Sequence, residues 1–542
     1  MDRDLVLLHP PSIFDFRKRP LFPGPIAYTV AESTDQFLTP PIGVLSIAEF
    51  LDRRGYRVSV DNLGERMARD SGFDPESYIA GTRARVYGVD LHWCVHAQGA
   101  IEVARMCKNT HPDSLVVLGG LTATKFHDEI ILKCGFVDAV IRGEAEDPFL
   151  MLFSSLDKHG GLNSVPNLTY REQGGRVRQE PLIKPRENID DFEFTRLDLL
   201  EPKGAALSGS ASPHWSLPVC RGCTYDCATC GGSAYSYRTY LGRERHGFRS
   251  PGRIAEDLEK LSEQGVRLVF LFQDPRMGGS KYLADFVSTL RSASARLDSL
   301  TIELFQPADQ DYVRELSRLG VHITLTMSPE SGCDATRTLH GRGYSSEALL
   351  KTVANCRASG MDLMVFFMLC LASETRETML ETWKLWDRLY CDESQQKEEP
   401  STIHSFGSMI LLDPGSRAFD FPEKNGYRLV SKTLEDLVRA RELPSWHQWI
   451  SYETDVMDRA SMATLMLDSM EKSIEIWEKH GVYERLQAAQ ERLRRVDAYR
   501  WAVEEVDRIT REERDEGTRA SALKSLRETM DRYEVPKPPE TP

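Results

Sequence analysis

The stretch LPVCRGCTYDCATCGGS, residues 217–233, decides the fold. It opens on a short apolar run that predicts a β-strand, and it then places Cys220, Cys223, Cys227 and Cys230 in one loop. The whole chain has 11 cysteines, an odd number, which argues against a framework of paired disulfides. Thiols gathered this closely in a chain without a secretory signal indicate a metal centre.

Alternating strands and helices surround this loop. Glycine and proline residues bound the helices, and the apolar runs between them predict strands. These strands are Leu217–Val219, Arg267–Phe272, Leu300–Phe305, His322–Met327, Leu363–Met368 and His404–Leu412. Six such units predict a partial (β/α)6 barrel over residues 213–425. Because barrel active sites lie in the loops at the carboxyl ends of the strands, we expect the cysteine loop at that mouth.

Residues 1–155 predict a second α/β unit. Five apolar runs alternate with stretches of helical spacing, which is typical of a doubly wound, flavodoxin-like parallel sheet. The expected strands are Leu5–Leu8, Arg57–Val60, Val86–Val89, Leu115–Leu118 and Val137–Ile141. We expect residues 156–212 to be a connector. Residues 426–542 are densely charged with helical apolar spacing, and predict a C-terminal α-helical region.

Composition narrows the class of protein. A chain of 542 residues is long enough for roughly three to four domains. Its 82 acidic and 68 basic residues give a net charge of −14, which argues against a nucleic-acid partner. No apolar run approaches the roughly 20 residues of a membrane helix. The N-terminus carries no signal-peptide pattern, so we expect a cytoplasmic protein without a membrane partner.

Cys223, Cys227 and Cys230 form a C-x3-C-x2-C motif. Three thiolates on a four-iron cube leave one iron without a protein ligand, open to a substrate or cosubstrate. In this motif, placed after the first barrel strand, the chain resembles the radical S-adenosylmethionine (SAM) family. The resemblance implies a [4Fe–4S] cluster whose open iron binds SAM. Thr229 is a departure, since an aromatic residue often precedes the last cysteine in that family.

A zinc site is the alternative for the cysteine loop. Cys220 together with the three motif cysteines would supply four thiolates for a tetrahedral ion. Zinc ligands usually come in two separated pairs, whereas these four share one loop, so the spacing favours the iron–sulfur cluster. Cys220 stands at a strand end, where a buried free thiol is the simpler role.

The resemblance also points to residues that bind SAM. In the radical SAM family a glutamate on the fourth strand contacts SAM, and glycines after the cluster let the backbone approach closely. The expected SAM-binding residues are Gly231, Gly232, Asp274, Gln306, Glu330 and Arg342. The alternative for each is the ordinary polarity of a barrel rim.

The N-terminal domain resembles the cobalamin-binding domain of one branch of this family. Thr39–Gly43, Gly119–Thr124 and Gly143–Glu146 carry the resemblance, since glycines at strand ends admit a large flat ligand. It implies cobalamin contacts by Pro41, Gly43, His92, Trp93, Gly119, Gly120, Thr122, Gly143 and Glu144. The Asp-x-His-x-x-Gly motif of some cobalamin enzymes is absent, so His92 would coordinate cobalt, or Trp93 or Leu91 would cover that face. A flavodoxin-like domain without a ligand is the alternative.

Together the two resemblances imply a cobalamin-dependent radical SAM methyltransferase. The cofactors then carry the chemistry, and no residue is expected as a catalytic acid or base. The resemblance also implies an external electron donor of the flavodoxin or ferredoxin type. Two alternatives stay open: a rearrangement or cyclisation enzyme on the same cofactors, and a zinc-stabilised binding protein.

Length and domain order are similar to those of the phosphinate P-methylases of phosphinothricin-type antibiotic pathways. That similarity implies a small natural-product intermediate as substrate, methylated on an unactivated carbon or on a phosphinate phosphorus. The specific expectation is P-methylation of an N-acetyl-demethylphosphinothricin-type compound in antibiotic biosynthesis. An anionic phosphinate needs a cation, which Arg238, Arg243, Arg245 or Arg249 would supply. The alternative is that these arginines lie on the surface in contact with water.

Overall fold

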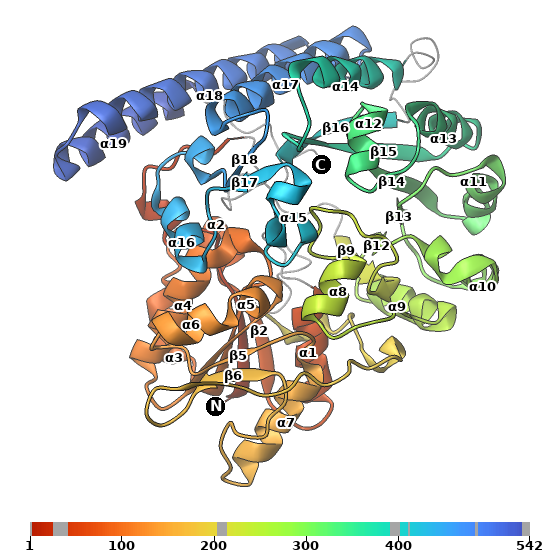
Figure 1. Cartoon of the computed structure of the whole chain (residues 1–542). Helices are drawn as coiled ribbons and strands as arrows, with labels where there is room; N and C mark the ends of the chain where they lie inside the picture. The colour runs from red at the N-terminus through yellow and green to blue at the C-terminus, as the bar shows by residue number, and fades with distance from the viewer. Residues whose placement is uncertain are drawn as a thin grey trace.

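The computed structural model describes residues 3–24, 42–202, 214–390, 402–409, 412–482 and 486–533. These residues form three regions (Figure 1). An α/β domain holds the N-terminus, a second α/β unit packs against it, and long helices lie at the end of the molecule away from the N-terminal sheet. The predicted α/β class with a helical C-terminal region is confirmed.

The N-terminal domain has one sheet with the strand order β7-β6-β5-β4-β3-β1-β2-β8. Its parallel core consists of β1 (Arg3–His9), β2 (Val58–Asn62), β3 (Ala84–Asp90), β4 (Leu115–Gly119) and β5 (Ala139–Ile141). These strands are largely buried because they are runs of valine, leucine and isoleucine with helices on both faces. The strand order reverses between β1 and β3, so a ligand of this sheet is expected where those two strands end.

The helices of this domain follow the predicted alternation. They are α1 (Ile42–Asp52), α2 (Leu63–Arg69), α3 (Pro75–Gly81), α4 (Ala97–Thr110), α5 (Leu121–Lys125), α6 (His127–Lys133) and α7 (Glu146–Asp157). Asn62 and Asp74 accept hydrogen bonds from the first turns of α2 and α3, as N-cap side chains do.

Part of the expected connector belongs to the N-terminal sheet. The strands β6 (Leu168–Arg171) and β7 (Val177–Gln179) form an antiparallel hairpin on β5, and β8 (Leu200–Glu201) pairs with β2 at the opposite edge. Residues 156–202 therefore complete both edges of the first sheet before the chain enters the second unit.

The second unit is a parallel sheet whose strands follow one another in chain order. They are β9 (His214–Pro218), β12 (Leu268–Phe272), β13 (Ser299–Leu304), β14 (His322–Glu330), β15 (Asp362–Leu369) and β16 (Thr402–Met409). Within the described residues β9 and β16 pair only on one side, so the barrel is partial, as predicted. Its helices are α8 (Ala234–Tyr240), α9 (Pro251–Glu263), α10 (Gly279–Ser292), α11 (Gln310–Leu316), α12 (Asp334–Leu339), α13 (Ser346–Ala358) and α14 (Arg376–Arg388).

Burial alternates along the barrel strands. In β15, Leu363, Val365 and Phe367 are fully buried under the helices, while Met364 and Phe366 between them are half-buried. A period of two is what a strand with one covered face and one partly open face requires. The half-buried faces line the inside of the partial barrel.

Three barrel strands end in an unusual backbone conformation. Gln273, Glu330 and Cys370, at the ends of β12, β14 and β15, have φ angles of +72°, +67° and +63°. Non-glycine residues rarely adopt positive φ, and such residues gather at functional sites. These three residues therefore lie at the carboxyl ends of the strands, where the sequence predicts that the barrel binds its ligand.

The C-terminal region joins both other parts. Its elements are α15 (Arg417–Asp420), β17 (Tyr427–Leu429), α16 (Leu434–Glu442), β18 (Tyr452–Thr454), α17 (Arg459–Lys479), α18 (Leu486–Glu512) and α19 (Glu516–Tyr533). Helix α16 packs on α4 of the N-terminal domain, and α17 packs on α14 and β16 of the barrel. Phe22 is buried in an apolar cluster with side chains of α18 and α19.

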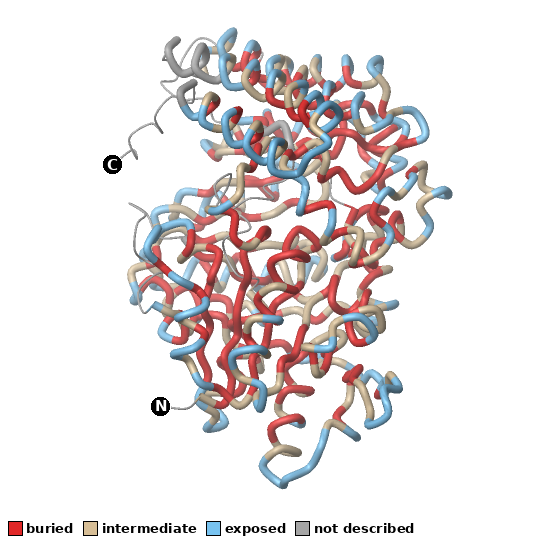
Figure 2. The backbone as a smooth tube through the Cα atoms, turned by 90° about the vertical axis from the view of Figure 1, so that its left-hand side faces the viewer, coloured by how far each residue is buried: buried red, intermediate tan, exposed pale blue. Residues whose placement is uncertain are grey.

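Figure 2 shows buried backbone running through the N-terminal sheet and the barrel, while the C-terminal helices keep exposed outer faces. None of the helices in the described ranges is long and apolar enough to cross a membrane.

Candidate cofactor site

The cysteine loop follows β9, as predicted. A two-residue ribbon of β10 (Cys220–Arg221) and β11 (Gly247–Phe248) holds its start, and Ser233 ends it by capping α8 through the backbone N–H of Ser236. Two backbone N–H groups point at the ligand sulfurs: Tyr225 donates to Cys223 Sγ at 3.3 Å, and Gly232 donates to Cys230 Sγ at 3.2 Å. Such bonds are typical of iron–sulfur sites, whose reduction potential they tune.

The three motif thiols are protonated in the protein without a bound cation. Burial raises the pKa of all three, that of Cys223 to about 11, so they need a bound cation to become thiolates. Cys220 is buried and donates from its thiol to the carbonyl of Gly222, so it takes the structural place expected for it.

The loop touches the N-terminal domain directly. A Cβ atom on Gly231 would lie 2.3 Å from Leu121 Cδ2, at the start of α5, and 2.9 Å from Asp413 Cβ. The carboxylate of Asp413 accepts the Gly231 N–H at 2.9 Å, and burial raises the pKa of Asp413 to about 6. Only glycine therefore allows the two domains and the β16 exit loop to approach one another beside Cys230.

Two of the predicted SAM residues meet at the barrel mouth. Glu330 is buried, and its carboxylate accepts from Nε and Nη2 of Arg342 at 3.2 and 3.1 Å. The guanidinium of Arg342 lies over the ring of Phe305 and close enough to Cys227 to act on its thiol. The pair thus places one carboxylate and one guanidinium beside the cysteine loop.

Glu303 was not predicted, yet it lies in the same mouth. It points inward from β13, its carboxylate accepts the backbone N–H of Gln273 at 2.5 Å, and burial raises its pKa. The period-two pattern of β13 was the available signal, because Glu303 is a charged residue on the inward face of a predicted core strand.

The remaining predicted SAM residues have other partners. Asp274 is buried and bonds the guanidinium of Arg276 at 2.6 Å and the N–H of Phe305 at 2.9 Å, which fixes the β12 exit loop. Gln306 bonds Arg276 through its own carbonyl. Gly232 is exposed beside Cys230. A contact between these residues and SAM stays a prediction.

A cluster of imidazoles marks the strand ends of the N-terminal sheet. His9 ends β1 and Asp90 ends β3, and His9 Nδ1 lies 2.7 Å from Asp90 Oδ2 in a buried pair across the point where the strand order reverses. His96 and Trp93 pack with their rings against His9. Sequence analysis missed His9, although its position at the end of the first strand was the available signal.

His92 stands at the open side of this cluster. Burial lowers its pKa, so the imidazole is neutral at pH 7 and able to bind a metal. The described residues offer that imidazole no hydrogen bond, and the edge of Trp93 lies against it. The main chain of His92 is held, because its N–H donates to Asp90 and its carbonyl accepts from the Thr122 hydroxyl at 2.9 Å.

Gly120 packs directly against the main chain of His92. It has a φ of +108°, and a Cβ atom there would lie 2.6 Å from His92 Cα. Gly120, which leaves no room for a side chain, and the His92 imidazole, which has no hydrogen bond from the described residues, form a strand-end cradle that fits a large flat ligand with a metal centre. Gly43 faces open space and Gly119 is only loosely packed, so both tolerate a nearby ligand. Pro41 lies outside the described residues.

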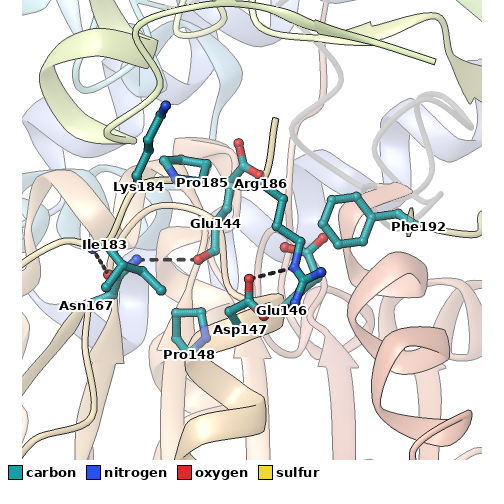
Figure 3. A pocket seen from close by; sticks show the side chains of 10 residues that line it. All are labelled: Glu144, Glu146, Asp147, Pro148, Asn167, Ile183, Lys184, Pro185, Arg186 and Phe192. Carbon is teal, nitrogen blue, oxygen red and sulfur yellow. Dashed lines mark hydrogen bonds and ion pairs between the residues drawn. The ribbon is translucent and has the colours of Figure 1, made fainter. Parts of the chain in front are cut away.

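The loop after β5 faces the barrel. Gly143 has a φ of +75° and packs against Leu241 of the barrel unit. Glu144 accepts hydrogen bonds from two arginines, Arg221 and Arg243, and thereby joins the two domains. Figure 3 shows Glu144 and Glu146 near the start of α7, with Arg186 bonded to Asp147 beside them.

Two of the four arginines expected to hold an anionic substrate are paired with carboxylates of the protein. Arg243 is paired with Glu144, and Arg249 forms a fully buried ion pair with Asp257. Arg238 and Arg245 are exposed. The partner of Arg243 lies 99 residues away in the other domain, whereas Asp257 lies only eight residues from Arg249.

Family models match both domains. The model described as the radical SAM superfamily matches residues 217–385, and the one described as the B12 binding domain matches residues 29–153. The first match contains the three motif cysteines, and the second contains His92 and Gly120.

Curated relatives are similar at low identity. An uncharacterized methyltransferase of Pyrococcus horikoshii is 24% identical over 364 residues, which are 66% of this chain and 75% of the relative. The hopanoid C-3 methylase of Methylococcus capsulatus is 26% identical over 46% of this chain, and the match spans only 44% of that protein.

Two solved structures share the fold. The radical SAM methyltransferase TsrM from Kitasatospora setae, solved with cobalamin and a [4Fe–4S] cluster, has a TM-score of 0.54 and 17% identity over 80% of this chain and 81% of its own. The cobalamin-dependent SAM radical enzyme OxsB has a TM-score of 0.60 and 13% identity over 97% and 75%. At these identities the likeness concerns the fold alone. The two matched family models, together with the cysteine loop and the cluster of side chains at the strand ends, show that the chain contains a radical SAM domain and a B12-binding domain, whose cofactors are a [4Fe–4S] cluster with SAM and cobalamin.

Proposed function

We propose that this enzyme methylates an unactivated carbon or a phosphinate phosphorus of a small natural-product intermediate, and specifically an N-acetyl-demethylphosphinothricin-type compound in antibiotic biosynthesis. The observation that carries the proposal is the contact of Gly231, beside the last cluster cysteine, with Leu121 of the cobalamin-binding domain. This contact supports the proposal, because a substrate held where the two domains meet would reach both cofactors.

The protein's own part is to bind and to orient. Cys223, Cys227 and Cys230 would hold the cluster, and the Glu330–Arg342 pair would meet the charged amino acid end of SAM at the barrel mouth. When bound, the cluster and SAM supply a radical and cobalamin carries the methyl group. The electrons would come from an external donor of the flavodoxin or ferredoxin type.

Arg441 supports an anionic acceptor. It lies on α16 and is fully buried, and its Nε and Nη2 atoms have no acceptor within the ranges that the structure describes. Its Nη1 donates to the carbonyl of Trp449, and the thiol of Cys94, which follows β3 of the cobalamin-binding domain, interacts with it electrostatically. A buried guanidinium without an acid is costly, and an oxyanion such as a phosphinate would satisfy it.

His92 is the candidate for the lower cobalt ligand. Its imidazole is neutral, and its main chain is fixed by Asp90 and Thr122. In protein loaded with cob(II)alamin, a nitrogen ligand splits the electron paramagnetic resonance lines, and uniform 15N labelling of histidine would change that splitting. We expect the splitting in the parent protein and its loss in His92→Ala. Unsplit lines in the parent protein would assign the lower face to Trp93 or Leu91 instead.

Product analysis tests the methyl transfer itself. The protein would be reconstituted anaerobically with iron, sulfide and hydroxocobalamin, then incubated with SAM, dithionite and N-acetyl-demethylphosphinothricin. We expect 5′-deoxyadenosine, S-adenosylhomocysteine and a product heavier by one methyl group. Both SAM products without a methylated compound would refute the acceptor, and 5′-deoxyadenosine alone would favour a rearrangement or cyclisation.

A further inference from the structure

One arginine of the cluster loop reaches into the other domain. Arg221 lies between Cys220 and the first motif cysteine, and its guanidinium donates from Nη1 to Glu144 at 3.0 Å and from Nη2 to Glu146 at 2.5 Å. Nη2 also lies 3.0 Å from the hydroxyl of Ser46, which donates to Glu146 at 2.7 Å. All three partners belong to the cobalamin-binding domain.

A second arginine supports the same carboxylate. Arg243, which follows α8 of the barrel unit, donates from Nε and Nη2 to the two oxygens of Glu144 at 2.6 and 2.9 Å. Its Nη2 also donates to the carbonyl of Arg186. Two guanidinium groups from the barrel thus meet two carboxylates from the cobalamin-binding domain, and their charges cancel.

This group of four is shielded from water. The side chains of Arg221 and Glu146 are 13% and 4% exposed, and that of Arg243 is 3% exposed. Phe192 covers the guanidinium of Arg221 at 4.4 Å from the ring centroid. Shielded bidentate pairs are directional, so they fix an orientation more sharply than surface ion pairs do.

We propose that Arg221 is a positioning residue that sets the placement of the iron–sulfur cluster relative to cobalamin. Its backbone belongs to the loop that carries the cluster ligands, while its side chain is bound by the domain that carries cobalamin. Any rotation between the domains would separate its planar fork from two carboxylates at once. A lysine at this position keeps the positive charge but lacks the planar guanidinium that binds two carboxylates, so it should preserve the position of the cluster relative to cobalamin only in part. The proposal does not depend on the identity of the methyl acceptor.

The test measures the separation of the two cofactors directly. Dithionite reduces the loaded protein to cob(II)alamin and a one-electron-reduced cluster, and both are paramagnetic. The nearby cluster then speeds the spin relaxation of cob(II)alamin, to an extent that falls steeply with distance. The parent protein, Arg221→Lys and Arg221→Gln would be compared at equal iron, sulfide and cobalamin content.

Arg186→Gln is the matched control. Arg186 forms a bidentate pair with Asp147, next to Glu146 at the start of α7, at 2.8 Å for both bonds. This pair ties the α7 terminus to the segment before β8 and does not touch the cluster loop. Its loss should leave the relaxation of cob(II)alamin as it is in the parent protein.

We expect Arg221→Gln to lose most of the relaxation enhancement, Arg221→Lys to lose part of it, and Arg186→Gln to lose none. Parent-like relaxation in an Arg221→Gln protein with full cofactor content would overturn the proposal. If Arg221→Gln takes up no cluster, Glu146→Gln decides by the same measurement, since it weakens the group from the side remote from the cysteines. Unchanged relaxation in Glu146→Gln would then overturn the proposal.

A chemical readout accompanies the magnetic one. In protein that titanium(III) citrate has reduced to cob(I)alamin, with no acceptor present, 5′-deoxyadenosine reports chemistry within the barrel alone, whereas S-adenosylhomocysteine reports methyl transfer from SAM to cob(I)alamin. A positioning role predicts that Arg221→Gln lowers the ratio of S-adenosylhomocysteine to 5′-deoxyadenosine. A general loss of folding would lower both products together and leave the ratio unchanged, which would also count against the proposal.

Discussion

Replacing Glu374 with glutamine should remove a pH dependence from the stability of the barrel. Glu374 follows β15 and is fully buried. Its Oε2 accepts the N–H groups of Cys370 and Leu371 at 2.7 and 3.3 Å, while Oε1 has no partner within the described residues. Burial raises the pKa of this carboxyl from 4.5 to about 8. The group therefore folds as the neutral acid at physiological pH.

The sign follows from the proton count. Between pH 4.5 and about 8 the folded chain keeps a proton that the unfolded chain has lost, so stability falls as the pH rises through this window. Each pH unit costs about 1.4 kcal/mol, so the free energy of unfolding that Glu374 removes is below about 1 kcal/mol at pH 5 and about 3 kcal/mol at pH 7. Glutamine keeps an oxygen for the two N–H groups and has no proton to lose. The stability gained in Glu374→Gln should therefore grow with pH up to about 8 and then level off.

The assay is urea unfolding of the apo protein, read by pulse proteolysis at pH 5, 7 and 8. Glu381→Gln, an exposed glutamate on the nearby α14, is the matched control and should follow the parent protein at each pH. A stability difference between Glu374→Gln and the parent that stays the same from pH 5 to pH 8 would refute the reasoning. A Glu374→Gln protein that is less stable than the parent at pH 8 would refute it as well.

Three further substitutions test the site. Cys223→Ala should abolish iron and sulfide uptake in anaerobic reconstitution while Cys220→Ala retains it; equal loss in both would put Cys220 among the ligands. Gly120→Ala should weaken cobalamin binding by about tenfold or more, because the position combines a φ of +108° with a blocked Cβ, while Gly135→Ala, which faces open space, should bind normally in absorbance titrations. Arg441→Met should stabilise the apo protein by about 1–4 kcal/mol in urea, since it removes a buried charge without an acid; destabilisation would show that the chain itself satisfies the guanidinium.

Local patterns explain what the sequence predicted well. The spacing of Cys223, Cys227 and Cys230 predicts the radical SAM family that the family model matches, because the whole motif lies in one short loop and needs no tertiary information. The barrel strands were found for a similar reason, since each is an apolar run bounded by glycine or proline. Glu330 and Arg342 lie only twelve residues apart, and they meet at the mouth where strand order places them.

The features that were missed depend on contacts between distant segments. The partners Arg221 and Glu144 are 77 residues apart in different domains, and nothing local to either residue indicates the other. In the sequence Arg243 has no visible partner, because Glu144, the carboxylate that it binds, lies 99 residues away in the other domain. The strand β8 has only two residues and therefore shows no alternation of apolar and polar side chains, so the sequence predicts a connector there.

The burial of Phe22 has a consequence for how the chain is made. Its backbone bonds Pro444 and Trp446, and its ring packs against α18 and α19. Phe22 is synthesised long before α18 and α19, so it obtains these partners only after both helices have left the ribosome. Until then the nascent chain exposes the apolar ring of Phe22, which a chaperone would bind. Ribosome-arrested chains of increasing length should show late protection of this segment from protease, appearing only once α19 has emerged.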